Sequence, residues 1–448
     1  MSEQLVRRLL IDLSSQSVSF RVLSPGVRPS ITQPLVEGFY NQCMARLQRI
    51  AALPDDMSTE TRTRLSLPLR HGGCGYRSPG FTAPMAYWAA TVAASSETAE
   101  IARHGAARHT HILNFHDSLK GRKAALEAYL HMKNELGIPT TKRATPPPKI
   151  GDDNWRLLPF RFSDISDHYR GLTRTDKLQR QLTQAAEYNI VSAFSATAQN
   201  PNLTTQLRAA AMSNTANWLT SIPKNRQWEL GRAELALNLR LRLGLSPLDL
   251  LPKQCSCGFS MPKDPWHALS CKFVRGASVT ARHNNVRDRM RIFAQSHGVP
   301  AIPEPQTSTT SNEHPDIQFF FPNRREFTDV TVRHTLAPSY RGKSPQVVLD
   351  KAALDKTNKY RDMCEEQGGS FTPLVTSTLG HIHKTGAKLL KRIFEANPDI
   401  TPADSLRDFK TEINAAVAKG NASIVQHWMV LNSRGLTASK QALFAPPR

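Results

Sequence analysis

Residues 314–332 read HPDIQFFFPNRREFTDVTV, and the order of strand-forming and turn-forming residues here decides the fold of the C-terminal half. β-Branched and aromatic residues favour strands at Ile317–Phe321 and again at Phe327–Val332. The segment Pro322–Arg325 between them is typical of a turn. The stretch therefore predicts a β-hairpin.

The expected hairpin brings two aspartates together. With an even-numbered loop centred on 323–324, Asp316 lies opposite Thr331 and Gln318 lies opposite Asp329. Because side chains alternate between faces, all four then share one face. Two converging carboxylates repel unless a cation joins them, and Mg²⁺ prefers such oxygens. The pair predicts metal-assisted phosphodiester cleavage. The alternative interpretation is two surface aspartates near turns.

A second candidate group follows in a helix-prone stretch that begins near residue 346. Lys356, Lys359 and Tyr360 are spaced i, i+3 and i+4, so they lie on one face of a helix. Two ammonium groups and a phenol there could position water and offset charge on a cleaved phosphate. The alternative is a solvated charged face.

Residues 255–271 read CSCGFSMPKDPWHALSC and hold three of the six cysteines. The ligand types at Cys255, Cys257, His267 and Cys271 form a Cys₃His set, which is a standard structural zinc site. The alternative is three free thiols and a surface histidine. The other three cysteines are isolated and are expected to be buried small apolar residues: Cys43, Cys74 and Cys364.

Composition limits the classes of protein that the chain can belong to. Its 448 residues suggest two to four domains, and 40% hydrophobic residues exclude full disorder. Lys and Arg exceed Asp and Glu by 58 to 37, a formal charge of +21 that predicts a nucleic-acid partner. No long apolar run or signal peptide is visible, so no membrane partner is expected. Six cysteines are too few for a disulfide scaffold and indicate a reducing, intracellular compartment.

The two halves of the chain differ in texture. Residues 1–250 are expected to be mostly helical, with an extended linker at 138–153 because of its triple proline. Within 226–245 the leucines alternate with a strand period, yet the strong helix formers and Gly244 favour a helix, which is our prediction.

From 251 onward the sequence indicates a mixed α/β region. A basic helix is expected at 278–295, followed by short strands. Further helices are expected near 346–366, 382–395 and 403–418, and then a polar tail.

The motifs, in their order, resemble the C-terminal part of non-LTR retrotransposon proteins that carry a restriction-enzyme-like endonuclease. In that family a CCHC zinc knuckle precedes an Arg-His element, a Pro-Asp, a second Asp and a Lys-x-x-Lys-Tyr helix. The matching positions here are 255–271, Arg282-His283, Pro315-Asp316, Asp329 and Lys356–Tyr360. The segment 65–77, LSLPLRHGGCGYR, is more loosely similar to the family's segment after the polymerase palm.

The resemblance implies a multidomain fold: a mostly α N-terminal half, a zinc knuckle and an α/β PD-(D/E)xK domain like that of restriction endonucleases. The implied regions are a reverse-transcriptase thumb-like helical region at 1–105, a helical linker region at 106–250, a CCHC zinc knuckle at 251–275 and a nuclease domain with a C-terminal tail at 276–448.

The implied activity is Mg²⁺-dependent DNA hydrolysis that nicks a target to prime reverse transcription in the nucleus, with structural Zn²⁺ in the knuckle. Asp316 and Asp329 would hold Mg²⁺, and the face formed by Lys356, Lys359 and Tyr360 would serve catalysis. DNA, and element RNA as a further partner, would be held by the basic helix through Arg282, His283, Arg287, Arg289 and Arg291. The alternative is a catalytically silent nucleic-acid-binding remnant.

The chain departs from the family pattern in three ways. Thr331 stands where the superfamily has its motif lysine, so Lys356 or Lys359 is the expected substitute. His314 replaces the basic residue before Pro-Asp. No polymerase palm is visible, so this chain alone is not expected to polymerise DNA, and a polymerase acting in trans is unknown. Glu304 is a candidate for a further acidic group.

Overall fold

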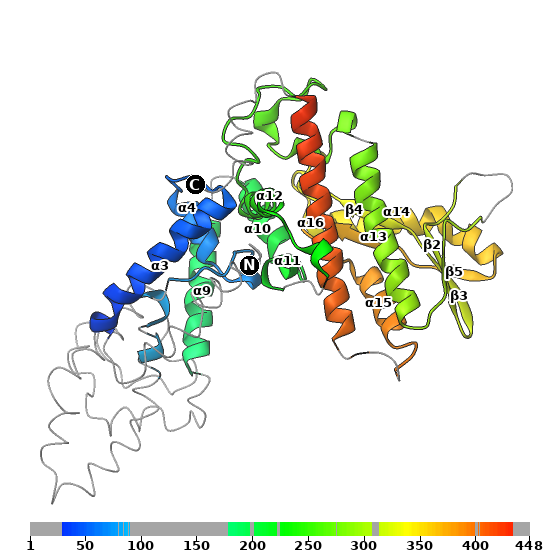
Figure 1. The fold of residues 1–448 in the computed structure, drawn as a ribbon, viewed down its shortest axis with the longest axis horizontal. Coiled ribbons are helices and arrows are strands. Elements are labelled where there is room, and N and C mark those ends of the chain that lie inside the picture. The colour runs from blue at the N-terminus through cyan, green and yellow to red at the C-terminus, as the bar shows by residue number, and fades with distance from the viewer. Residues whose placement is uncertain are drawn as a thin grey trace, which may run out of the picture. The chain divides into compact units, whose positions relative to one another are not determined.

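The computed structural model of the chain describes two compact units (Figure 1). The described residues are 29–78, 80–83, 85–87, 89, 178–197, 201–221, 225–274, 276–306, 313–398, 402 and 404–432. One unit contains, among these, 46–74 and everything from 201 onward, and the other contains 29–45, the described part of 75–89 and 178–197. The predicted linker at 138–153 and the polar tail after 432 lie outside the described residues.

The smaller unit is helical where it is described. It contains the first part of α3 (Pro29–Ala51) and α9 (Leu178–Thr197). The Tyr40 hydroxyl donates to the Tyr76 carbonyl at 3.3 Å, and Arg77 forms an ion pair with the buried Glu187.

The larger unit combines helices with a small sheet, as the sequence predicts for its C-terminal part. Its helices are α4 (Thr59–Ser66), α10 (Pro201–Ala211), α11 (Asn217–Thr220), α12 (Arg232–Leu243), α13 (Ala277–Ser296), α14 (Pro345–Glu366), α15 (Lys384–Phe394) and α16 (Ser405–Leu431). Its strands are β1 (Ala301–Pro303), β2 (Ile317–Phe321), β3 (Arg324–Thr328), β4 (Val330–Arg333), β5 (Gly369–Phe371) and β6 (Leu374–Ser377).

The strands form a four-stranded sheet and a two-stranded sheet. Four strands are ordered β1-β2-β3-β5, and β4 pairs with β6. The β3–β5 and β4–β6 pairings are both parallel. Between them, the amide of Leu374 donates to the Asp329 carbonyl at 3.0 Å. Asp329 therefore lies where one parallel ladder ends and the next begins.

The hairpin is present, but its register differs from our prediction. Ile317 pairs with Thr328 and Phe321 pairs with Arg324, so the turn is the two residues Pro322–Asn323. Continuing this register brings Asp316 level with Asp329, not with residue 331. The prediction was wrong by two residues because Arg324 joins the strand. A slip of two keeps the same face, whereas a slip of one would have reversed it.

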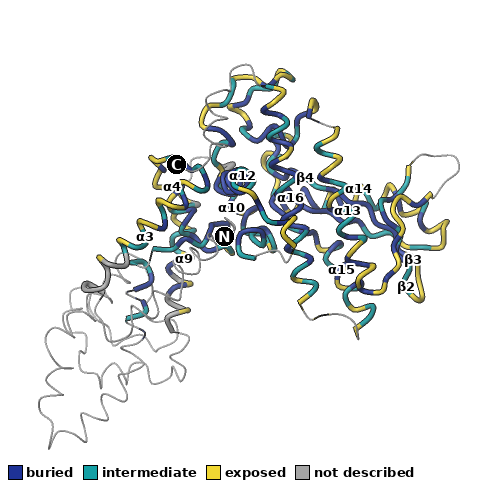
Figure 2. The backbone as a smooth tube through the Cα atoms, in the orientation of Figure 1, coloured by how far each residue is buried: buried dark blue, intermediate teal, exposed yellow. Residues whose placement is uncertain are grey.

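The ambiguous segment 226–245 is helical over α12, which confirms our prediction. Gly244 ends the helix in a left-handed conformation with φ of 71°. The alternating leucines fit a helix because every residue from Leu235 to Leu243 is buried (Figure 2). Arg242 lies among them and donates to the carbonyls of Gly73 and Leu69, so helix α12 packs against residues 69–73.

The last helix is longer than predicted. We expected it to end near 418 and to be followed by a polar tail, but α16 continues to Leu431 because 422–430 is largely apolar and packs in the core. Gly420 permits a close approach within it, since a Cβ there would lie 2.3 Å from Cγ of Arg282.

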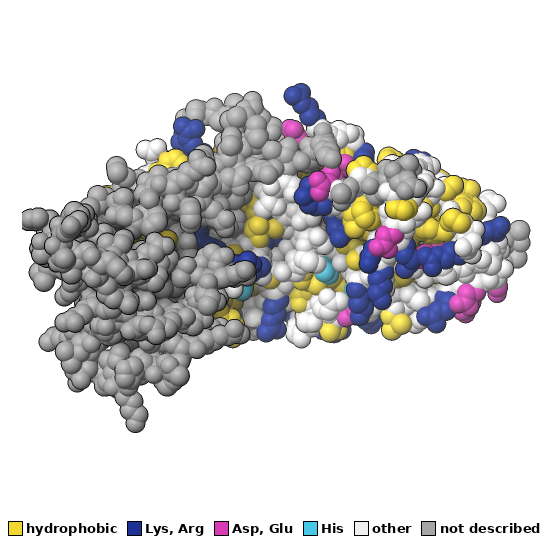
Figure 3. All heavy atoms as spheres, turned by 90° about the horizontal axis from the view of Figure 1, so that it is seen from below, with side chains coloured by type: hydrophobic (Ala, Val, Ile, Leu, Met, Phe, Trp, Pro, Cys, Tyr) yellow, Lys and Arg dark blue, Asp and Glu magenta, His cyan; other side chains and the backbone are white. Residues whose placement is uncertain are grey.

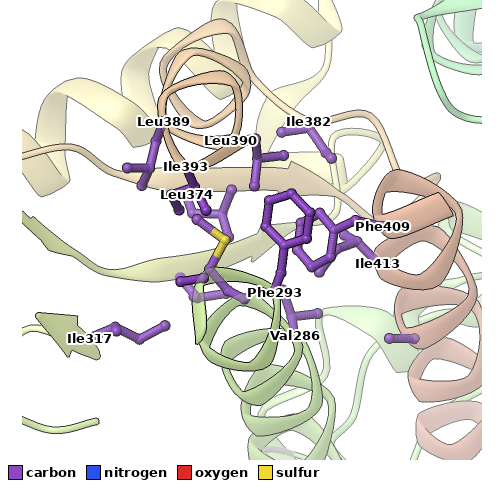
Figure 4. Close-up of a cluster of buried hydrophobic side chains, with 14 of the residues drawn as sticks. Val286, Phe293, Ile317, Leu374, Ile382, Leu389, Leu390, Ile393, Phe409 and Ile413 are labelled. Carbon is purple, nitrogen blue, oxygen red and sulfur yellow. The ribbon is translucent and has the colours of Figure 1, made fainter. Parts of the chain in front are cut away.

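The core of the sheet region lies between the strands and three helices (Figure 4). Val286 and Phe293 of α13 point toward side chains from α15, α16 and β6, and Phe293 stacks on Phe409 with centroids 4.0 Å apart. This packing holds α13 against the strands that flank Asp316 and Asp329.

Candidate functional site

The four Cys and His side chains predicted to bind zinc converge. Their ligand atoms, one from each of Cys255, Cys257, His267 and Cys271, all lie within 4.8 Å of one another. The Sγ atoms of Cys255 and Cys271 are 3.7 Å apart, and Sγ of Cys257 is 3.1 Å from Nε2 of His267. Two thiolates on one tetrahedral Zn²⁺ are separated by about 3.8 Å. The group can therefore hold a metal such as zinc.

The knuckle is part of the core of the larger unit. The indole of Trp428, on α16, donates to Sγ of Cys255 at 3.2 Å, and Phe259 stacks on His267 with centroids 4.0 Å apart. Burial raises the pKa of the Cys271 thiol to about 12. A bound metal ion would reverse that shift, since coordinating thiols are deprotonated. The sequence contains no signal that would have identified Trp428 as a partner of this site.

The two aspartates of the hairpin meet at one end of the sheet. Asp316 precedes β2, and its Oδ2 accepts from the amide of Val330 at 2.6 Å. Its Oδ1 lies 3.0 Å from Nε2 of His283, on α13. Asp329 is 4% exposed, and its Oδ2 lies 2.8 Å from Nζ of Lys356. The structure therefore joins α13, the hairpin and α14 at this point.

The face of α14 predicted to serve catalysis does point at this pair. Lys356 and Lys359 lie 5.5 and 5.0 Å from the ring centre of the buried Tyr360. Burial, and then the charge of Asp329, raise the pKa of Tyr360 to about 12. Nζ of Lys359 pairs with Glu313 at 2.9 Å, so it is Lys356 that contacts the carboxylate pair directly. Of the two lysines on this face, Lys356 is therefore the one that lies at Asp329.

The charge of Asp316 acts on the carboxyl group of Asp329. The pKa of Asp329 is raised, first by burial and then by the charge of Asp316, and Lys356 and His283 offset part of this shift. The pKa of His283 is raised because its hydrogen bond and attraction to Asp316 outweigh burial, which acts in the opposite direction. The charged form of the His283 imidazole is therefore more favoured here than it is in a free histidine.

Glu304 lies beside the cluster but is already paired. Its amide donates to the Asp316 carbonyl at 2.8 Å, and its carboxylate forms an ion pair with Arg287. It adopts a positive φ of 48°, which is unusual for a residue other than glycine. The backbone contact places it near Asp316, whereas its charge is directed at Arg287.

Of the α13 residues predicted to grip nucleic acid, Arg282 needs correction, and nucleic-acid contact by the others stays a prediction. Arg282 is only 4% exposed, donates to Asn421 at 2.8 Å and has its pKa lowered to about 10 by burial, so it supports α16 and cannot reach a phosphate. His283 belongs to the acidic cluster. Arg289 pairs with Glu412 and lies 4.2 Å from the ring of Trp228. Arg291 donates to Gln295 at 3.3 Å. Helical spacing alone does not say which cation points inward.

The described surface carries the positive charge in dispersed form. Figure 3 shows Lys and Arg side chains over the described part of one face, interspersed with Asp and Glu. A membrane-crossing helix is not found among the described residues.

Among the described residues, the Cys/His set is the group of three or more ligands that could hold a metal, and Asp316 and Asp329 do not form a second one. Neither a scan of protein-family models nor a search of curated proteins finds a match to the chain. The chemistry of the two sites therefore rests on their geometry and on the resemblance of the motifs.

Proposed function

We propose that this chain contains the endonuclease region of a non-LTR retrotransposon protein, with a restriction-enzyme-like nuclease fold, and that it cleaves DNA phosphodiester bonds in the nucleus. One observation carries the proposal. Asp316 directly before β2, Asp329 between β3 and β4, and Lys356 on α14 meet at one end of a sheet, with Asp329 buried and paired to the lysine. A carboxylate pair next to a lysine is the composition that metal-assisted phosphate hydrolysis uses.

The donor set suits a hard cation, because carboxylate oxygens are the ligands that Mg²⁺ prefers. Asp316 and Asp329 would hold the ion, and a bound Mg²⁺ supplies Lewis acidity and a lowered pKa of bound water. Lys356 supports a negative charge developing on the phosphate, since its ammonium already lies at Asp329. His283 orients Asp316 through Oδ1.

Burial of Asp329 has a consequence for this chemistry. Asp329 is buried, and the attraction between a carboxylate and a cation is stronger where the effective dielectric constant is lower than that of water. Its raised pKa, due to burial and Asp316, would be relieved by a divalent ion at the pair. Occupation of the pair by a metal and deprotonation of Asp329 are thus expected to be coupled.

The test is nicking of supercoiled plasmid by the purified full chain across a range of Mg²⁺ and Mn²⁺ concentrations. The proposal expects open-circular product that rises with metal concentration and is absent in metal-free buffer. Absence of product at every metal concentration, from protein that binds the same plasmid, would contradict it.

The second candidate is nucleic-acid binding without cleavage, as in a catalytically silent remnant of a retroelement. It is favoured by the formal charge of +21, because electrostatic binding to phosphates does not require an intact active site. The plasmid assay separates the two functions, because a silent binder retards the plasmid on a gel and leaves it supercoiled.

A further inference from the structure

An exposed aromatic ring lies directly after the last candidate ligand of the zinc knuckle. Phe273 follows Cys271 by two positions and is 56% exposed. Trp266 and Trp428, which also belong to the core cluster at the knuckle, are buried. The knuckle therefore packs its other large rings into the core and leaves this one in solvent.

The end of α16 adds further exposed apolar side chains beside the knuckle. Val430 and Leu431 are 64% and 46% exposed. The hydroxyl of Ser256, which lies between two of the candidate cysteine ligands, donates to the Leu431 carbonyl at 3.4 Å, and the turn Lys272–Val274 packs on α16. Single exposed apolar residues are ordinary on a protein surface, whereas several of them at one place indicate a binding surface.

The backbone that carries Phe273 is held by the knuckle although the ring is exposed. The Phe273 amide donates to Sγ of Cys271. The next amide, that of Val274, donates to the Cys271 carbonyl at 3.3 Å, and the Val274 side chain is buried in the core cluster that contains Trp428. A ring mounted on a fixed backbone loses little conformational freedom when it binds a partner, and this favours binding.

Exposed cations accompany the ring and indicate the chemistry of the partner. Nζ of Lys272 lies 5.7 Å from the centre of the Phe273 ring. Lys253 and Lys263, the other two lysines of the knuckle, are exposed as well. The one acidic residue of the knuckle, Asp264, is buried. The surface is therefore both apolar and basic, which suits an anionic partner that has flat apolar faces.

We propose that Phe273 is a platform on which an unpaired nucleobase stacks, and that Lys272 binds the phosphate of the same nucleotide. Sites for single strands combine aromatic rings with basic side chains, because every base has a face that can stack and every nucleotide carries a phosphate. A duplex does not offer that face, since its bases are already stacked on one another. An apolar protein partner would use the ring but not the lysines. This surface goes beyond the proposed cleavage activity and does not depend on it.

Fluorescence anisotropy of a labelled oligo-dT strand, titrated with the zinc-loaded full chain in buffer without Mg²⁺, measures this binding apart from cleavage. A strand of the same length in which every position is abasic keeps the phosphates and lacks the bases. Oligo-U in place of oligo-dT shows whether RNA or DNA supplies the base more effectively. A duplex of the same length is the fourth probe.

The decisive variant is Phe273→Leu, which keeps an apolar side chain and removes the ring. Its affinity for oligo-dT should fall by about tenfold, because one stacked base is lost. Its affinities for the abasic strand and for the duplex should equal those of the parent, since neither offers an unpaired base. Phe273→Trp enlarges the stacking face and should bind oligo-dT a fewfold more tightly than the parent, with the abasic strand unaffected.

The salt dependence separates the ring from the lysine. A plot of log affinity for oligo-dT against log salt concentration has a slope of about −0.7 for each phosphate contact with a single strand. Lys272→Gln should make this slope less steep by about 0.7, because one contact is lost. Phe273→Leu should lower the affinity at every salt concentration and leave the slope unchanged, since stacking releases no counterions.

Tyr188→Leu is the matched control, because it removes another exposed ring, on α9, and it should leave all affinities unchanged. The proposal is overturned if Phe273→Leu binds oligo-dT as tightly as the parent, or if it loses as much affinity for the abasic strand as for oligo-dT. Loss of self-association in Phe273→Leu, with oligo-dT affinity unchanged, would assign the surface to a second copy of the chain instead. Should Phe273→Leu lose its zinc, Phe273→Trp decides, and equal affinity of that variant and the parent for oligo-dT overturns the proposal.

Discussion

At the residue scale, Asp329 is a buried carboxylate between one negative and one positive neighbour. Asp316 and burial raise its pKa, whereas Lys356 at 2.8 Å lowers it. A metal ion therefore stabilises the charged form of this buried carboxylate more than it stabilises that of an exposed one. In the proposed nuclease, this contact lets a lysine from α14 take the place of the motif lysine, where the strand carries Thr331.

Lys356→Met tests the role of that lysine. Removing the ammonium group is expected to lower the cleavage rate by about 100-fold or more, because charge support at the phosphate is lost. Lys356→Arg should restore part of the rate, since the charge returns with a different shape. Initial rates of plasmid nicking measure the effect. Lys351→Met, an exposed lysine on the same helix, is the control, and an equal loss there would contradict a specific role.

His334 predicts a pH dependence of stability. Burial, assisted by Arg282, lowers its pKa to about 3, so the folded state keeps the ring neutral while the unfolded chain binds a proton below about 6.5. Stability from this group is therefore fully present above pH 6.5 and is lost as pH falls toward 3, by up to about 1.4 kcal/mol per pH unit. Urea unfolding at pH 4, 5, 6 and 7 gives the free energy of unfolding at each pH. The decrease of this free energy with falling pH should be less steep for His334→Gln than for the parent. Equal slopes would contradict the assignment.

Residue types and spacing were enough to predict that Asp316 and Asp329 lie close together, that Lys356 lies at Asp329, and that the four Cys and His side chains converge, because each set has a characteristic composition. They were not enough for α13. Arg282 and His283 are adjacent, yet one supports α16 and the other contacts Asp316. The direction in which a cation points depends on the helices packed around it, and local sequence does not encode that.

At the element scale, α16 is shaped by Gly420. Replacing a helical glycine by alanine usually stabilises a helix by about 1 kcal/mol. Gly420→Ala should instead destabilise the larger unit by about 1–3 kcal/mol, because its Cβ would overlap the side chain of Arg282. Chemical denaturation measures the change. Gly38→Ala on α3 is the control, since nothing lies within 4 Å of its added Cβ. A stabilising Gly420→Ala would refute the packing at this crossing.

The knuckle predicts that metal and fold are linked in the larger unit. Because Cys255, Cys271 and Trp428 share one core cluster, loss of zinc should lower the melting temperature of that unit, not merely loosen a loop. Elemental analysis should find one zinc per chain, reduced in Cys257→Ser and unchanged in Cys43→Ser. A parent protein without zinc, melting at the same temperature as Cys257→Ser, would show that the site is not a metal site.

Helices with clear periodicity were predictable, whereas pairing details were not. The prediction of a helix at α12 was based on its helix formers and on Gly244, and the structure confirms it. The hairpin register depended on whether Arg324 belongs to the turn or to the strand. The sequence is compatible with both, and in the structure Arg324 pairs with Phe321 in the strand. The end of α16 was missed because residues 419–421, Lys-Gly-Asn, look like a stop, while their helical conformation depends on packing against α13.

At the scale of the whole molecule, the larger unit draws its residues from distant parts of the chain. Segment 46–74 shares a compact unit with the knuckle and the sheet, and Arg242 hydrogen-bonds to Gly73 across 169 positions. The mixed helix-and-sheet composition was predictable. Which early segment joins the later one was not, because such contacts depend on tertiary packing. Nucleic-acid binding, which the formal charge of +21 predicts, remains a prediction.

The most direct test of the central claim compares three variants in one plasmid-nicking and plasmid-binding experiment with Mg²⁺. Asp316→Asn and Asp329→Asn remove a charged oxygen ligand at nearly constant shape, and Asp362→Asn removes an exposed charge elsewhere. We predict that the first two lose cleavage by at least about 100-fold while plasmid binding stays within a fewfold of the parent, and that the third cleaves normally. Parental cleavage rates in both Asp316→Asn and Asp329→Asn would contradict the nuclease assignment.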